Sequence, residues 1–180
     1  MARWATARTR GSSGLSRALW FLGVAEIERR LTELGLTLPR PFAPPPGVEF
    51  KFALVRLSGA TAYVSGHLPM DGSEILARGK VGAGVTVEEG HEAARLTALS
   101  VLASLKQELG DLDRVTGWVK ALGLVNCAPQ FSNTPAVING FSELILELWG
   151  EAGRHARSAI GAAELPFDVP VEVEAICEVA

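Results

Sequence analysis

The chain has 180 residues, of which 48% are hydrophobic and 21% are charged, as in one globular domain that buries a substantial core. No apolar stretch reaches the roughly 18 residues of a membrane-spanning helix, so no membrane partner is expected. Residues 1–23 contain four arginines and no acidic residue, which leaves 13 basic and 20 acidic residues in the rest, a net charge of −7. Such an acidic domain should repel a polyphosphate backbone, which argues against a nucleic-acid partner.

The N-terminal segment, residues 1–23, is set apart from the predicted domain, which spans residues 24–180. Arginine and serine without acids are typical of a transit peptide. The apolar run at residues 18–25 would suit the core of a signal peptide, although Glu26 follows at once and no A-x-A cleavage site is present. A third interpretation, which we favour, is an extension that takes no part in the fold.

The first predicted element is a helix that ends at Gly35, since apolar residues recur before it at helical spacing. These residues are Val24, Ile27, Leu31 and Leu34. Residues 39–47 contain five prolines and predict an extended strap. Residues 50–57 and 60–65 then predict two strands joined at Ser58-Gly59.

The middle of the chain predicts a third short strand near residues 76–81, followed by a long helix. Thr86 and Glu89 form a capping box, in which each side chain accepts a hydrogen bond from the other residue's backbone N–H, and Gly110 ends the helix. Residues 115–125 are rich in β-branched residues and predict a central strand.

A third helix is predicted to begin after Asn133, with Pro135 in its first turn, and to end at Gly150. Residues 157–163 and 169–179 predict the last two strands. This order predicts an α+β fold, in which a mixed six-stranded sheet carries two helices on one face, with the N-terminal helix in addition.

The last predicted strand has two distinct faces. Its alternate residues from Val169 to Val179 are apolar and should face the helices, while Glu172, Glu174, Ile176 and Glu178 should face away. A solvated sheet face explains the glutamates on its own.

The turn at residues 165–168 would bring Arg157 back beside Glu172 and Glu174. There the guanidinium would form an ion pair worth under about 1 kcal/mol. Alternatively, it would bind a substrate carboxylate while a glutamate handles a proton or water. Spacing alone leaves both interpretations open.

Other reactive side chains show no pattern of a metal or redox site. His67, His91 and His155 lack ligand spacing, so no metal is predicted, and His67 is interpreted as a capping or packing residue. Cys127 and Cys177 are interpreted as small buried hydrophobic residues in a reducing compartment, which predicts a cytoplasmic protein.

Four stretches in order resemble the RidA family, also called YjgF, and in particular a longer bacterial branch known as endoribonuclease L-PSP. They are VSGHLP at residues 64–69, GKVG at 79–82, GRHARSAIG at 153–161, and LP at 165–166 followed by PVEVEA at 170–175. The resemblance covers about residues 24–179. It implies the chorismate-mutase-like α+β fold and a homotrimer with clefts at the subunit interfaces.

The resemblance also implies an activity and a site. Members hydrolyse reactive enamines and imines such as 2-aminoacrylate to 2-keto acids and ammonia, which predicts a 2-iminobutanoate/2-iminopropanoate deaminase-like hydrolase without metal or cofactor. Arg157 matches the arginine that grips the substrate carboxylate, and Glu172 matches the glutamate that positions or activates water. Ser65 and Gly66 match the loop that lines the cleft, and Asn139 matches a site asparagine.

Two positions depart from the family pattern. Phe52 stands where the best-known members carry an aromatic hydroxyl, and Ala159 stands where many carry cysteine. The lost hydroxyl favours an alternative, a non-catalytic protein that binds small carboxylates. The branch's name adds a further alternative, a ribonuclease or translation inhibitor, against which the net charge of −7 counts.

Overall fold

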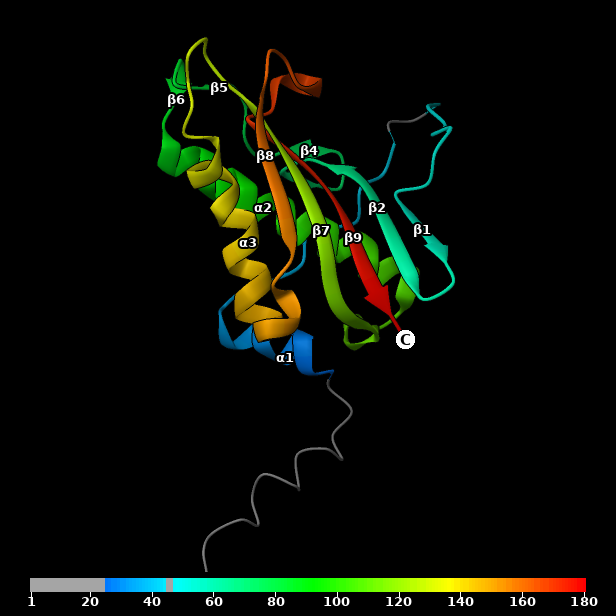
Figure 1. Cartoon of the computed structure of the whole chain (residues 1–180). Coiled ribbons are helices and arrows are strands. Elements are labelled where there is room, and N and C mark those ends of the chain that lie inside the picture. The colour runs from blue at the N-terminus through cyan, green and yellow to red at the C-terminus, as the bar shows by residue number, and fades with distance from the viewer. Residues whose placement is uncertain (1–24, 45–46) are drawn as a thin grey trace, which may run out of the picture.

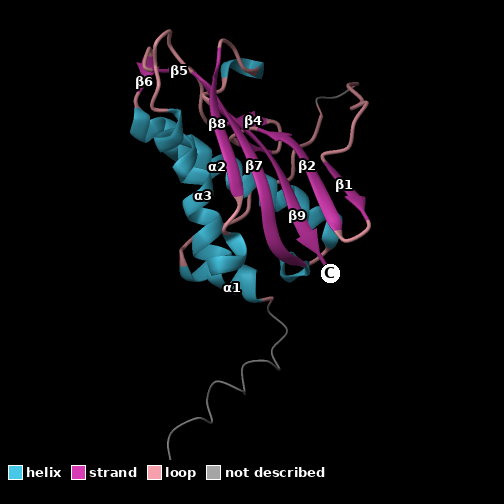
Figure 2. Ribbon diagram, in the orientation of Figure 1, coloured by secondary structure: helices cyan, strands magenta, loops and turns pink. Residues whose placement is uncertain are grey.

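A five-stranded sheet with helices against one face forms the body of the protein in the computed structural model, which describes residues 25–44 and 47–180 (Figures 1 and 2). The predicted extension at residues 1–23 lies outside the described residues. The strand order is β1-β2-β9-β7-β8. These strands are β1 (Val55–Ser58), β2 (Thr61–His67), β7 (Val115–Asn126), β8 (Ala156–Ala162) and β9 (Val171–Val179).

Within residues 25–44 and 47–180, three α-helices accompany the sheet: α1 (Glu26–Glu33), α2 (Val87–Leu109) and α3 (Thr134–Trp149). In Figure 1, α2 runs behind the strands and α3 lies beside it. The two long helices pack backbone to backbone, since a Cβ added at Gly140 would lie 1.9 Å from the carbonyl oxygen of His91. Short 3-10 helices at Leu112–Arg114, Gly150–Gly153 and Pro166–Asp168 complete the connections.

The sheet is mixed, as predicted. β2 pairs antiparallel with both β1 and β9, and β9 pairs antiparallel with β7. β8 pairs parallel with β7, because the chain returns through α3 between these two strands. The predicted α+β fold is therefore confirmed, with β8 at the sheet edge beside β7.

The sheet has five strands and not the six predicted, because residues 76–81 do not join it. Residues 70–75 form a small hairpin of β3 (Met70–Asp71) and β4 (Glu74–Ile75). β5 (Lys80–Val81) pairs with β6 (Gly84–Val85), and a single isolated bridge joins Val81 to Cys127. Gly79, Gly82 and Gly84 have φ angles of 107°, 84° and 113°. These left-handed conformations interrupt an extended chain.

The first strand is shorter than the predicted 50–57. β1 pairs with β2 from Val55 to Ser58, but the register of β2 against β9 shifts between Val64 and His67. The backbone N–H of Ser65 in this bulge still donates to the carbonyl oxygen of Leu54 at 2.9 Å, but the regular pairing stops there, which leaves residues 50–54 outside the strand.

Helix ends follow the predicted local signals. Thr86 Oγ1 accepts a hydrogen bond from Glu89 N at 3.1 Å, and Glu89 Oε2 accepts one from Thr86 N at 2.8 Å. Gly110 ends α2 with a φ of 79°. Gly150 ends α3, and Pro135 lies in its first turn, as the sequence indicates.

The two faces of β9 are also as predicted. Val171, Val173 and Cys177 are fully buried against the helices, whereas Glu174 and Glu178 are exposed on the other face. Within the part of the chain that the structure describes, no helix combines the length and the apolar character needed to cross a membrane. One face of the sheet is covered by helices, and no element of the described residues covers the other.

Candidate functional site

A cavity of about 420 Å³ opens beside the carboxyl-terminal end of β2 and the start of β9. Its walls are mainly apolar, with four phenylalanines, Phe42, Phe50, Phe52 and Phe167. The rings of Phe42 and Phe50 stack with centroids 4.9 Å apart, and those of Phe50 and Phe52 with centroids 5.0 Å apart. The volume suits a small organic molecule.

Glu172 is the acidic group in this cavity, and it lies directly against Gly66. A Cβ added at Gly66 would lie 1.9 Å from Glu172 Oε1, so any larger residue would displace the carboxylate. The bulge in β2 between Val64 and His67 brings the Gly66 backbone to this position. The predicted residues Phe52, Gly66 and Glu172 are therefore brought together.

The environment of Glu172 changes its acidity. Partial burial raises the pKa of Glu172, and the negative charge of Glu174 raises it further. A carboxyl group with a raised pKa holds a proton more readily at neutral pH, so this residue suits the exchange of a proton with a bound molecule.

The side chains of Ser65 and His67 form hydrogen bonds within the protein that support the cavity wall. Ser65 Oγ donates a hydrogen bond to the carbonyl oxygen of Ala53 at 2.7 Å, which ties the bulge to the segment before β1. His67 Nδ1 lies 2.7 Å from the carbonyl oxygen of Ser65, and His67 Nε2 lies 2.8 Å from Ser104 Oγ. Burial lowers the pKa of His67, which favours its neutral form and confirms the predicted packing role.

Arg157 lies in a second cluster, against α3. Its Nη1 donates to Asn139 Oδ1 at 3.0 Å and to Ser142 Oγ at 2.9 Å, and its Nη2 donates to the carbonyl oxygen of Pro135 at 3.4 Å. All three acceptors are neutral. Among the described residues, no carboxylate oxygen lies within 4.0 Å of the guanidinium, and Glu143 acts on it only at longer range.

The hydrogen bonds of Arg157 extend to Ser142 and His155, neither of which was predicted from the sequence as a site residue. His155 Nδ1 lies 2.8 Å from the carbonyl oxygen of Gly153 and so carries the proton, which leaves Nε2 to accept from Ser142 Oγ at 3.0 Å. The Ser142 hydroxyl then accepts from Arg157. Burial is the main cause that lowers the pKa of His155, which favours the neutral ring with its proton on Nδ1 and its Nε2 free to accept. The one sequence signal was that Ser142 follows Asn139 by three residues on a helix.

The structure corrects the expectation that Arg157 lies beside Glu172 and Glu174. Arg157 aligns with Ala121 of β7, and Ala121 aligns with Ala175 of β9. β7 therefore separates β8 from β9, which places the two strands roughly 10 Å apart. Arg157 also faces the helices, whereas Glu172 is on the open face. One chain therefore carries two separate half-sites, the Arg157 cluster against α3 and the cavity at Glu172.

Ala159, two residues after Arg157, packs at the edge of the core, and its carbonyl oxygen accepts a hydrogen bond from Thr134 Oγ1 at 3.0 Å. The position where many family members carry a thiol is thus occupied by a methyl group on the same side of β8 as Arg157.

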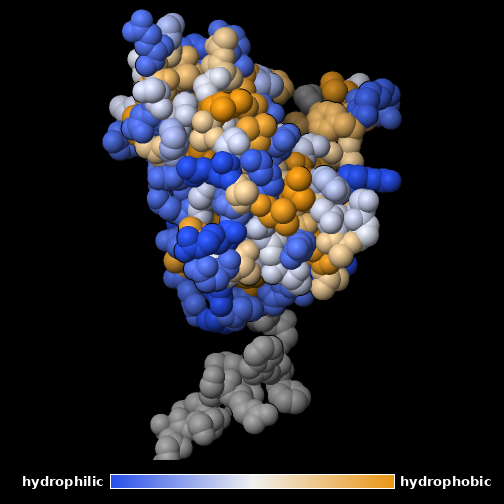
Figure 3. All heavy atoms as spheres, viewed as in Figure 1, coloured by the Kyte–Doolittle hydropathy of each residue, from blue (hydrophilic) through white to orange (hydrophobic). Residues whose placement is uncertain are grey.

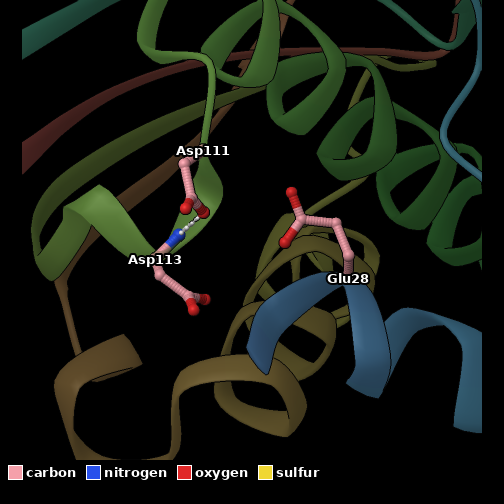
Figure 4. Close-up of side chains that lie close together, drawn as sticks. All are labelled: Glu28, Asp111 and Asp113. Carbon is pink, nitrogen blue, oxygen red and sulfur yellow. Dashed lines mark hydrogen bonds between the residues drawn. The ribbon is translucent and has the colours of Figure 1, made fainter. Parts of the chain in front are cut away.

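A third cluster contains three carboxylates, Glu28, Asp111 and Asp113, whose oxygens lie within 4.8 Å of one another (Figure 4). Asp113 accepts hydrogen bonds from the backbone N–H groups of Glu26 at 2.7 Å and Ile27 at 2.9 Å, so it caps α1 from outside the helix. Asp111 Oδ1 accepts from Asp113 N at 2.9 Å, and Glu28 pairs with Lys106. These contacts give the cluster a structural role.

Comparison with known proteins supports the predicted relationship. The family model described as "YjgF/chorismate mutase-like, putative endoribonuclease" matches residues 28–179. Protein TCP17 of Trypanosoma cruzi is 42% identical over 153 residues, which cover 84% of this chain and 93% of that protein.

Solved structures are similar over most of the chain. The protein Atu1372 of Agrobacterium tumefaciens, whose function is unknown, has a TM-score of 0.78 and 42% identity, covering 91% of this chain and 98% of that one. The structure of E. coli TdcF with bound serine has a TM-score of 0.53 and 22% identity over 80% of this chain and 96% of that one, a likeness of fold. The family that the model identifies supports a role in processing or binding a small molecule. The chain therefore belongs to the YjgF/chorismate mutase-like family.

Proposed function

We propose that the protein is a deaminase that hydrolyses reactive 2-imino acids and their enamine forms to 2-keto acids and ammonia. The observation that carries this proposal is the guanidinium of Arg157, which is partly buried and, among the residues that the structure describes, bonds to neutral acceptors alone. Its charge and its remaining N–H groups are available for a substrate carboxylate, which guanidinium binds in bidentate fashion. A guanidinium that is already oriented loses little entropy when it binds that group.

Glu172 supports the chemical step. Water adds to the imine carbon: Glu172 accepts one proton from that water, and bulk solvent supplies one to the imine nitrogen. Glu172 then returns its proton to the amine nitrogen, and the hydroxyl group gives up its proton to solvent. The resulting carbinolamine expels ammonia and leaves the keto acid, so one water molecule is consumed for each ammonia released. The raised pKa of Glu172 suits a group that first accepts and then returns a proton.

The two half-sites would be joined by a second copy of the chain. Arg157 of one protomer and Glu172 of its neighbour would face the same cleft in the homotrimer that the family resemblance implies. The open face of the sheet supports such an assembly, because hydrophobic residues lie exposed on it among hydrophilic ones (Figure 3). Tyr63 is 48% exposed and Ile160 is 51% exposed.

The activity is tested with imines generated in situ from amino acids by an amino-acid oxidase, with release of keto acid and ammonia as the readout. The wild-type protein should accelerate release. Arg157→Ala should lower kcat/KM by about 100-fold or more, because a charge-assisted anchor of the substrate is lost. Arg154→Ala is the matched control, since Arg154 is exposed and pairs with Glu151 at the surface. Wild-type rates equal to buffer for several imino acids would refute the proposal.

A second candidate is a protein that binds small carboxylates without turnover. Phe52, which lines the cavity without a hydroxyl group, favours it. In that case 2-keto acids would raise the melting temperature in a manner that depends on Arg157, and no imine would be hydrolysed. A ribonuclease is the weaker candidate, since the acidic net charge opposes RNA binding, and steeply salt-dependent RNA binding would be needed to support it.

A further inference from the structure

The cavity beside Glu172 is much larger and more apolar than the smallest imino acids require. A methyl side chain is close in size to one water molecule, whereas the cavity measures about 420 Å³. Besides Glu172, the polar side chains in its walls are those of His67 and Ser100, both of which are almost fully buried. A large apolar group would therefore find apolar contacts there and few unmet hydrogen-bonding groups.

Phe167 forms part of this wall in an unusual backbone conformation. Phe167 and Asp168 have φ angles of 57° and 58°, a left-handed region that residues with a Cβ seldom adopt. A bulky residue keeps such a conformation only where its surroundings enforce it, and strain of this kind is concentrated at ligand sites.

The surroundings of Phe167 enforce that conformation from three sides. Arg78 donates a hydrogen bond to the carbonyl oxygen of Phe167. The backbone N–H of Gly79 donates to the carbonyl oxygen of Asp168 at 2.6 Å. The buried Asn126 donates through Nδ2 to Asp168 Oδ1 at 3.2 Å. These contacts orient the Phe167 ring toward the cavity that contains Glu172.

Phe52 lines the same cavity from the segment before β1. Phe52 is 57% exposed and Phe167 is 55% exposed, so both rings present apolar surface that nothing else in the described chain covers. Exposed aromatic surface beside a carboxyl group is typical of a site whose ligand has an apolar part and a polar end.

We infer that the substrates of this site are 2-imino acids with a large apolar side chain, aromatic or branched aliphatic, and that Phe52 and Phe167 select them over imino acids with a methyl side chain. This inference rests on the proposed function. The imine carbon lies at Glu172, the side chain enters the phenylalanine-lined cavity, and the carboxylate points out to Arg157 of the neighbouring protomer. Because Phe52 lacks a hydroxyl group, its ring completes the apolar wall against which the side chain of the substrate packs.

The test compares imines generated in situ from phenylalanine, leucine and alanine. The wild-type kcat/KM should favour the phenylalanine imine over the alanine imine by about tenfold or more, since each buried methylene contributes strongly to such discrimination. Phe167→Gly removes the ring and relieves the left-handed backbone, so loss of folding is not expected, and this ratio should fall by about tenfold. Leu34→Ala is the control, because Leu34 is an exposed apolar residue outside the cavity, and it should leave the ratio unchanged.

A second measurement separates this inference from the proposed function. Binding of phenylpyruvate and of pyruvate is measured by calorimetry in the absence of any turnover, on the wild type and on Phe167→Gly, with the oligomeric state recorded for each. Tighter binding of phenylpyruvate that Phe167→Gly abolishes supports the inference even if no imine is hydrolysed. Equal hydrolysis of all three imines supports the deaminase and overturns the inference. The inference is also overturned if Phe167→Gly changes the oligomeric state and leaves the ratio of kcat/KM for the phenylalanine and alanine imines unchanged. The phenylalanines would then belong to a contact between copies of the chain.

Discussion

At the scale of single residues, the position of the Glu172 carboxylate depends on the absence of a side chain at Gly66. The distance of 1.9 Å between a built Cβ and Glu172 Oε1 leaves no room for alanine. The clashing atom is the end of a flexible side chain, so the fold can survive while the carboxylate moves. A side chain at position 66 is therefore expected to shift the Glu172 carboxylate more than it lowers the stability of the fold.

Gly66→Ala should therefore lower kcat/KM for imine hydrolysis by about tenfold or more and change the unfolding free energy by less than about 1 kcal/mol. Steady-state kinetics and thermal unfolding check the two parts. Gly117→Ala is the matched control, because its Cβ would lie 3.1 Å from the carboxylate of Glu178 at the other end of the sheet. Full activity of Gly66→Ala would mean that the exact position of Glu172 is unimportant.

The site residues differ in how far the sequence could predict them. Arg157, Glu172 and Gly66 were predicted because they lie in the stretches that carry the family resemblance, and Phe52 because it stands where the best-known members carry an aromatic hydroxyl. The structure gives each of them a distinct environment. Ser142 and His155 were missed, since their connection to Arg157 exists only through hydrogen bonds across α3 and β8.

At the scale of elements, α1 is held in place by a residue that lies 86 positions further along the chain. Its N-cap position, Ala25, offers no side-chain acceptor, and Asp113 accepts hydrogen bonds from the two N–H groups at the start of the helix instead. The negative carboxylate is also favourably placed at the positive end of the helix. Periodicity predicted this helix but not its cap.

Asp113→Ala should lower the unfolding free energy by about 1 to 2 kcal/mol, the usual loss when a helix cap is removed. Hydrogen exchange should show faster opening of α1 with little change in α2. Glu33→Ala serves as the control, because Glu33 lies at the other end of α1 and pairs with Arg29 at the surface. Unchanged exchange in α1 of the Asp113 variant would show that packing alone holds the helix.

At the scale of the whole molecule, the separation of Arg157 from Glu172 makes the proposed reaction a property of an assembly. Arg157 lies on the helix side of β8 and Glu172 on the open side of β9, with β7 between them. Neither side chain can cross the sheet, so a substrate that touches both must lie between two protomers.

Two inactive variants should therefore complement each other. Arg157→Ala and Glu172→Gln subunits are mixed in equal amounts, unfolded together and refolded. About one quarter of the sites in the resulting cyclic assemblies would then combine an intact arginine with an intact glutamate. Imine hydrolysis should recover to about that fraction of the wild-type rate, while each variant refolded alone remains inactive. No recovery from verified mixed assemblies would show that the two residues do not share a site.

The sequence by itself determined the local features of this protein. The capping box at Thr86 and the left-handed Gly110 are recognisable because a helix end depends on a few adjacent residues. The alternation along β9 is recognisable because neighbouring side chains of a strand point to opposite faces. Only the tertiary structure decided which strands are neighbours. Sheet pairing joins residues that are distant in the chain, and α3 carries the chain to a parallel position beside β7. That position sets Arg157 apart from Glu172 and divides the candidate site between two faces of one sheet.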